Sequence, residues 1–180
     1  MSPISNAKFF WNNRTQKRSF FLWRLNNCLI PFKDKLINFG IHGPFKCPFY
    51  NNKNTLDHSF LNCHFARSIW HHFESCFNLC PSINGTFNNY ITRWYLDFKS
   101  TIKDFNHVLP NTITWHLWKI RNKTIYDNKK ATFPEAINAL KTEIFAMSIA
   151  KPFATNEHAG PFNIFTAPTN KKDKRPAITV

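Results

Sequence analysis

Glycine and acidic residues are both scarce in this sequence of 180 residues. It contains 4 Gly, too few for the glycine-rich loops that cradle phosphates in P-loop and dinucleotide-binding folds. It has no run of about 18 apolar residues, which excludes a membrane-spanning helix. The first ten residues lack the apolar core and small-residue cleavage site of a secretory signal. We therefore expect an intracellular chain of about one domain's size.

Acidic side chains number 10 against 24 Lys and Arg, which gives a net charge of +14 at pH 7. The positive excess runs along the whole chain and is not confined to one tail. Such a field favours polyanions, and nucleic acid before a membrane surface, because no lipid-anchor motif or basic amphipathic terminus is present. A basic protein that merely tolerates its charge is the competing interpretation.

Aromatic residues are abundant, and 20 Phe with 6 Trp supply enough bulk for a packed core. Apolar residues recur at helical spacing, which predicts a mainly α fold. The first predicted helix, 16–28, should bury Phe21, Leu25 and Cys28. The remaining predicted helices are 31–39, a long helix carrying residues 65–80, 87–98, 111–127 and 133–150. A capping box of Thr132 and Glu135 marks the start of the last one.

The chain divides into three predicted parts. Residues 1–80 form a small helical domain with a loop-rich, zinc-knuckle-like insert near Cys47. Residues 81–150 form a helical extension packed on it. Residues 151–180 are rich in Pro, Thr, Asn and Lys, and we expect a disordered basic tail. The cluster Lys171–Arg175 in this tail is either a nuclear-import signal or a solvated run of charge.

Cys47 and Pro48 stand together in the predicted loop, followed by His58 and, after four more residues, by Cys63. A Cys-Pro turn suits a zinc knuckle, because the thiolate must point inward while nearby N–H groups bond to the sulfur. Five residues along an ideal helix leave two side chains about 140° apart. His58 and Cys63 can therefore share a metal ion only if a helix begins between them or is locally distorted.

A set of short motifs runs in a fixed order along the chain. These are KRSFFLWRL at 17–25, Ile30-Pro31, Cys47-Pro48, NTLDHSFLNC at 54–63, Ala66, Trp70 and WHLWKIRNK at 115–123. Together they resemble the zinc-binding region of reverse transcriptases from plant LINE-type (non-LTR) retrotransposons, over roughly residues 8–150. The resemblance implies a detached accessory segment of a retroelement polyprotein, in which the polymerase lies upstream and an RNase H domain often follows.

Tyr50 occupies the position at which this family has its second cysteine, and Asn54 replaces the family's Glu. The zinc ligands that the resemblance implies are Cys47, His58 and Cys63. A phenol with an unperturbed pKa near 10 is a poor zinc ligand beside a thiolate, so we expect a degraded zinc site. Three other residues could complete the set, and the spacing does not choose between them: His64, His42 and Cys28. The competing interpretation is that the cysteines are only buried thiols.

Two further patterns are interpreted as packing. Two cysteines four residues apart, Cys76 and Cys80, have histidines nearby and could bind a metal. They share a face with large apolar residues, however, and free cysteine behaves as a small hydrophobe. Trp115 and Trp118 could stack nucleic-acid bases, but we favour helix packing for both.

The function we expect is a non-catalytic nucleic-acid-binding accessory module, because the acidic clusters that polymerases and RNase H need are missing. RNA or DNA is the expected partner, through its phosphates, and neither a membrane nor a small-molecule substrate is expected. The basic residues predicted to contact phosphates are Lys17, Arg18, Arg24, Lys46, Lys53 and Arg67. The alternative is a relic or domesticated helical scaffold that contacts other proteins and binds neither metal nor nucleic acid.

Overall fold

The computed structural model describes residues 11–12, 15–30, 32–41, 46–50, 55–79, 85–97 and 105–150. Its helices are α2 (Gln16–Asn26), α3 (Lys33–Asn38), the π-helix η1 (His58–Asn62), α4 (His64–Cys76), α5 (Phe87–Asp97), α6 (Phe105–Tyr126) and α7 (Phe133–Ala150). This confirms the predicted mainly α fold. None of these helices is both long and apolar enough to cross a membrane. The predicted tail, Lys53, His42 and Cys80 lie outside the described residues.

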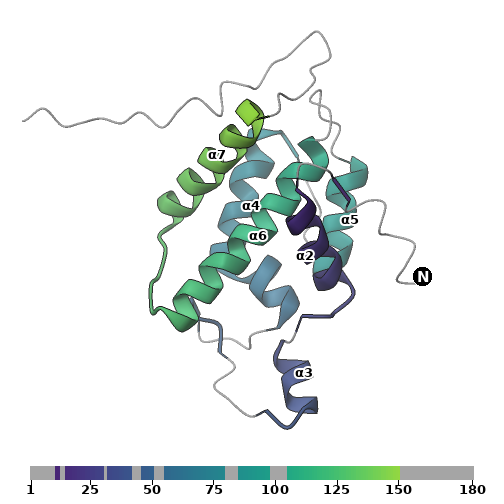
Figure 1. Ribbon diagram of the computed structural model, residues 1–180, viewed down its shortest axis with the longest axis vertical. Helices are drawn as coiled ribbons and strands as arrows, with labels where there is room; N and C mark the ends of the chain where they lie inside the picture. Colours follow the sequence, from purple (N-terminus) through teal and green to yellow (C-terminus); the bar gives the residue numbers. More distant parts are fainter. Residues whose placement is uncertain are drawn as a thin grey trace, which may run out of the picture.

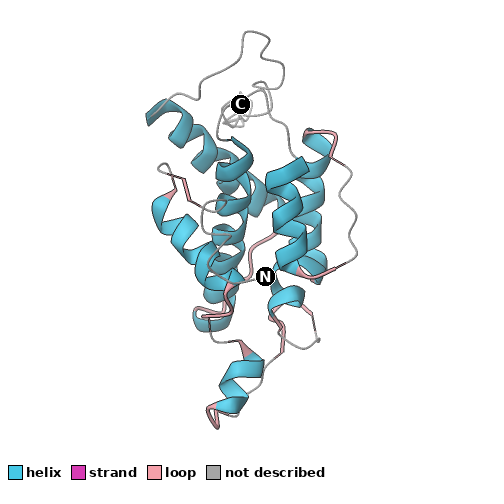
Figure 2. Ribbon diagram, turned by 90° about the vertical axis from the view of Figure 1, so that its right-hand side faces the viewer, coloured by secondary structure: helices cyan, strands magenta, loops and turns pink. Residues whose placement is uncertain are grey.

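Helix α6 runs through the middle of the molecule, with α2, α4, α5 and α7 around it (Figure 1). Its buried residues face every direction around the helix axis as far as Leu117, whereas the last turns bury one face and expose Ile125 and Tyr126. The face predicted from Ile113, Leu117, Ile120 and Thr124 is buried, which confirms that part of the pattern. Figure 2 shows the same bundle from the side, with α3 standing away from its lower end.

The start of α6 differs from the prediction, because the helix begins at Phe105 and not at 111. Pro110 indicated a break, since proline lacks an N–H for the helix and its ring crowds the preceding turn. The helix nevertheless runs through it. Val108 and Leu109, just before the proline, are completely buried and hold the first turns against the core.

A buried amide joins three helices at the centre of the bundle. Asn111 on α6 donates from Nδ2 to the hydroxyl oxygens of Thr15 and Ser19, at 3.1 and 3.0 Å, at the start of α2. Its Oδ1 accepts a hydrogen bond of 2.7 Å from the hydroxyl of Tyr95 on α5. A buried polar group is tolerated when it is satisfied, and here it fixes the register of α2 and α5 on α6.

The first predicted helix ends earlier than expected. Asn27 caps α2, and Cys28 follows with a left-handed backbone (φ 52°) and an exposed side chain, so it is not on the buried face. Phe21 and Leu25 are buried as predicted. Gly40 has φ 72° just after α3, which explains why a glycine ends that helix.

Candidate metal centre and basic surface

Cys47, His58 and Cys63 come together in the structure, although 16 residues of sequence separate the two cysteines. One ligand atom from each residue lies within 4.8 Å of the others. The two sulfur atoms are 3.7 Å apart. Two thiolates on a tetrahedral zinc, each with a Zn–S bond of about 2.3 Å, would be about 3.8 Å apart. The separation therefore suits two ligands of one ion and is too long for a disulfide.

The π-helix η1 brings His58 and Cys63 to the same side. The N–H of Cys63 donates to the carbonyl of His58 at 2.7 Å, so the two residues lie one wide turn apart. The backbone then becomes extended at Cys63 (φ −62°, ψ 132°), and α4 begins at the next residue. Of the two arrangements that the spacing allowed, the structure has the local distortion, and the new helix begins only after Cys63.

Three hydrogen bonds hold η1 in place. The Thr55 hydroxyl accepts from the N–H of His58 at 3.2 Å, as an N-cap does. The indole N–H of Trp70, a fully buried residue of α4, donates to the carbonyl of Phe60 at 2.7 Å. The carboxylate of Asp57 accepts from the first N–H of α5 at 2.8 Å. The wide turn is thus anchored to both α4 and α5.

Backbone N–H groups surround the sulfur of Cys47. Those of Phe49 and Tyr50 point at it, as the Cys-Pro turn predicted. The pKa of Cys47 falls to about 5, chiefly because the Cys63 thiol donates a hydrogen bond to it, and the two backbone donors add to the effect. Cys47 is therefore the more acidic thiol of the pair.

Cys63 is the N-cap residue of α4, so its sulfur faces the free N–H groups of Phe65 and Ala66. Its pKa is nevertheless raised, first because its proton is held in the hydrogen bond to Cys47 and second because it is buried. The two thiols share one proton, and a metal ion would take the place of that proton. Four backbone donors would then support two thiolates.

The imidazole of His58 fits a metal ligand. Its Nε2 atom is buried and has no hydrogen-bond partner among the described residues. A buried polar atom without a partner is costly unless something else satisfies it, and a zinc ion would do so. Cys47, His58 and Cys63 thus form a candidate zinc site with an incomplete ligand set.

No described residue takes the fourth position. The Tyr50 side chain is 44% exposed, and its ring packs near His64, with centroids 5.8 Å apart. His64 is itself exposed and lines a different pocket, and Cys28 is exposed at the end of α2. Neither joins the three-residue group, so the proposed substitutes that the structure describes do not complete it.

Arg121 is a neighbour of the centre that the sequence analysis did not single out. A small cavity lies beside the two thiols, and Leu117 and Arg121 of α6 form part of its wall. The guanidinium lies 5.3 Å from the ring centroid of Phe32 and 5.4 Å from that of Trp118. These contacts hold a positive charge near the thiols. The signal was available, because Arg121 belongs to the motif at 115–123.

The basic residues predicted to contact phosphates have different surroundings. Lys17, Arg24 and Lys46 are exposed, and none forms an ion pair with a described carboxylate. Arg18 is turned inward to Glu143 on α7, and 17% of its side chain is exposed. Among Lys17, Arg18, Arg24 and Lys46, the three exposed residues are therefore open to a partner.

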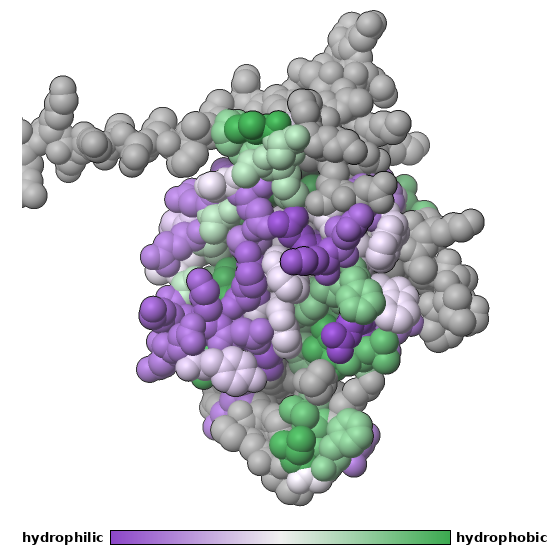
Figure 3. Space-filling model, viewed as in Figure 1, coloured by the Kyte–Doolittle hydropathy of each residue, from purple (hydrophilic) through white to green (hydrophobic). Residues whose placement is uncertain are grey.

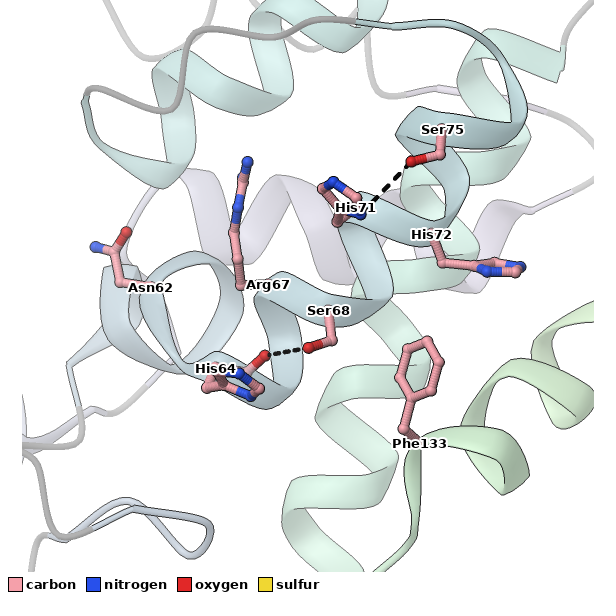
Figure 4. Close-up of a pocket in the computed structure, with 8 residues that line it drawn as sticks. All are labelled: Asn62, His64, Arg67, Ser68, His71, His72, Ser75 and Phe133. Carbon is pink, nitrogen blue, oxygen red and sulfur yellow. Dashed lines mark hydrogen bonds between the residues drawn. The ribbon is translucent and has the colours of Figure 1, made fainter.

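Arg67 lies in a polar pocket along α4, close to three histidines and two serines (Figure 4). Its Nη2 atom is 3.5 Å from the buried carboxylate of Glu74, and Nη1 is buried without a hydrogen-bond partner among the described residues.

In the same helix, His72 Nε2 is 3.9 Å from the sulfur of Cys76. No third metal ligand joins that pair in the described part of the chain.

The two tryptophans of α6 pack as predicted. Trp115 meets Phe21 edge-on with ring centroids 5.2 Å apart, and Trp118 contacts both Phe21 and Phe32. Both are half-buried in the contact between α2 and α6. They are therefore part of the core's edge, which confirms the interpretation as packing.

Residues 2–70 match the family model described as zinc-binding in reverse transcriptase. The match includes Cys47, His58 and Cys63, together with Trp70, whose indole anchors η1. Neither the comparison with curated proteins nor the comparison with solved structures found a match. The family likeness thus covers the three clustered ligands, and it supports a zinc-binding region related to that of reverse transcriptases.

Proposed function

We propose that this protein is a non-catalytic nucleic-acid-binding module derived from the zinc-binding region of a plant LINE-type reverse transcriptase, with a weakened zinc site. The observation that carries the proposal is the cluster of Cys47, His58 and Cys63 inside a segment that matches the family model described as zinc-binding in reverse transcriptase. Tyr50, which stands where the family has its second cysteine, accounts for the weakened zinc site.

A zinc ion at this site would be held by the two sulfur atoms and by Nε2 of His58. Bound there, it supplies a structural cross-link between the turn at Cys47 and the start of α4. The surrounding N–H groups stabilise the thiolates, and Trp70 keeps η1 in the shape that aligns His58 with Cys63. The role is one of support and not of chemistry.

The distribution of charge supports nucleic acid as the partner. Three of the described carboxylates serve internal contacts: Asp57 caps α5, Glu74 accepts from Tyr90, and Glu143 joins α2, α6 and α7. Exposed cations such as Lys17 and Arg24 form no ion pair with a carboxylate in the described part of the chain. A surface of this kind attracts phosphates.

The absence of an acidic metal site supports a non-catalytic role. Within the described residues, the one group of three potential metal ligands contains two thiols and an imidazole, and no carboxylate. Two-metal polymerase and RNase H chemistry requires clustered carboxylates to hold the ions. We therefore expect neither polymerase nor nuclease activity.

The zinc proposal is tested by Tyr50→Cys, which returns the fourth thiolate to the site. We expect the purified variant to hold about one zinc per chain and to unfold several degrees higher than the parent, which should hold little. Ile149→Cys is the matched control, because it adds a cysteine at a position that is 66% exposed, near the end of α7 and outside the residues that line the cavity beside the thiols. Metal content by mass spectrometry and thermal unfolding are the measurements. Equal, nearly stoichiometric zinc in parent and Tyr50→Cys would contradict a weakened site.

A second candidate function, a protein-interaction scaffold, is favoured by one patch. Ile37, Phe39 and Ile41, at the end of α3, are all exposed, Phe39 by 75%. Figure 3 shows hydrophobic surface at the lower end of the molecule, where α3 lies in Figure 1. Self-association that persists at high salt, with no nucleic-acid binding at low salt, would favour the scaffold.

A further inference from the structure

We propose that the outer face of α2 is a stacking platform for single-stranded nucleic acid, with a base on Phe20 and phosphates on Lys17 and Arg24. This inference rests on the proposed nucleic-acid function and specifies its partner. It specifies the surface that binds, the preference for single strands, and Phe20 as the residue that distinguishes single strands from duplexes. The three residues define what we call the α2 platform.

The spacing along α2 gathers the platform on one side of the helix. Lys17, Phe20 and Arg24 are three and four residues apart, so their side chains fall within about 60° of one another around the axis. All three are exposed, and Phe20 keeps 50% of its surface open to solvent. Hydrophobic and hydrophilic side chains lie next to each other over α2 in Figure 3. An open aromatic ring is thus flanked by two cations.

The ring of Phe20 already stacks on one neighbour, Trp23. Trp23 lies with its centroid 5.9 Å from that of Phe20 and its plane tilted by 18°. Trp23 is half-buried against the core, so it fixes the orientation of the exposed ring. A ring that is fixed and half open loses little conformational freedom when a base stacks on it.

Arg24 can serve either the ring or a phosphate. Its guanidinium carbon is 5.9 Å from the Phe20 centroid, close to the outer limit of a cation–π contact. A contact this long is weak at an exposed site, so an arriving base can displace it. The guanidinium is then free to bind the adjacent phosphate, or to continue the stack over the base.

Duplex nucleic acid does not suit this surface, because its bases are stacked inside and present no face to a protein ring. The two cations can still contact duplex phosphates. Single strands should therefore gain from Phe20 and duplexes should not. This difference separates the α2 platform from a surface that is only basic.

The test uses the full chain and fluorescence anisotropy with a short labelled oligouridylate and a duplex RNA of the same length. We expect Phe20→Ala to weaken single-strand binding by about 5- to 150-fold, the range for loss of one stacked base, with duplex binding unchanged. Phe20→Tyr should bind like the parent, and Phe20→Leu should bind as weakly as Phe20→Ala. Phe39→Ala, which removes an exposed ring just after α3, is the matched control and should have no effect.

The outcomes separate this inference from the function on which it rests. No binding of either RNA by the parent at low salt would overturn the nucleic-acid function itself. Parent-like single-strand binding by Phe20→Ala, or equal losses on both RNAs, would overturn the α2 platform alone. Parent-like binding by Phe20→Leu would show that apolar contact, and not stacking, is what matters. Self-association that Phe20→Ala abolishes, without any effect on RNA binding, would assign the face to a protein partner.

Discussion

Glu143 on α7 is the carboxylate on which side chains from two other helices converge. It contacts Arg18 of α2 and the imidazole of His116, and its Oε2 is 3.4 Å from the ammonium of Lys119. Arg18 also approaches the sulfur of Met147. Because two cations already balance one carboxylate, a further positive charge on His116 is unfavourable. Burial is the largest effect, and with Lys119, Arg18 and Lys123 it lowers the pKa of His116 to about 3.

This low pKa predicts a pH dependence of stability. Unfolded His116 titrates near pH 6.5, so between about pH 6.5 and 3 the unfolded chain binds a proton that the folded chain does not. The free energy of unfolding should therefore fall as the pH drops through this window, by up to about 1.4 kcal/mol per unit. His116→Gln should remove that part of the slope in urea unfolding, whereas His71→Gln, at an exposed position of α4, should not. The same slope in His116→Gln and in the parent would contradict the prediction.

At the scale of elements, η1 is the feature on which the candidate site depends. An ordinary α-helix through His58 would leave it about 140° from Cys63. The wide turn persists because Trp70 satisfies the carbonyl of Phe60 from the neighbouring helix. Trp70 does not contact the cysteines in this role; it positions the ligands.

Trp70→Phe should lower both stability and metal affinity. The substitution keeps a buried ring but leaves the Phe60 carbonyl without its donor, at a cost of about 1–3 kcal/mol. We expect zinc affinity to fall by about 10- to 100-fold, as when support around a metal ligand is removed. Competition titration with a chromophoric chelator and thermal unfolding measure the two effects. Trp115→Phe serves as the control for loss of an indole, and a Trp70→Phe variant of lower stability but unchanged zinc affinity would show that Trp70 only packs.

Local signals in the sequence predicted most of the helices, and long-range contacts explain the differences. The N–H of Thr132 donates to the carboxylate of Glu135 at 2.8 Å, as the capping box indicated, and α7 spans the predicted residues. Pro110 gave the wrong start for α6, because buried neighbours outweigh the local preference of proline.

The ligands of the candidate site were predicted from the sequence, and the backbone that aligns them was not. Spacing and family resemblance selected the cysteines and His58, and the structure brings them together. The π-turn could not be predicted, because it depends on a hydrogen bond from Trp70, which is ten residues from Phe60. The place of Arg121 beside the thiols also requires the fold, since α6 brings it there from a distant part of the sequence.

At the scale of the whole molecule, three of the described carboxylates are partly or fully buried, whereas Lys17, Arg24 and Lys46 are exposed. Glu74 and Glu143 join helices, and Asp57 caps one. Glu74 and Glu143 are paired with Arg67 and Arg18, so the net positive charge that a distant partner meets is carried by the remaining cations. The fold and the expected partner are linked through this arrangement.

This distribution predicts a definite salt dependence. If Lys17, Arg24 and Lys46 each neutralise one phosphate of a single strand, the logarithm of the binding constant should fall with the logarithm of salt concentration with a slope of about −2. Lys17→Ala should reduce the magnitude of the slope by about 0.7. Lys130→Ala, in the turn between α6 and α7, should leave it unchanged. A slope near zero in an anisotropy titration would mean that these charges do not meet phosphates.

The π-turn also limits how the length of this segment can change. Four residues separate His58 from Cys63, and their number sets the angle between the two side chains. Deleting or inserting one of them would rotate the imidazole by about 100° around the helix axis and remove it from the sulfur atoms. Asn62 is exposed, so many other residues can replace it, whereas the interval between His58 and Cys63 cannot gain or lose a residue. In related chains that keep a working centre, a fixed length here should outlast the identity of the residues within it.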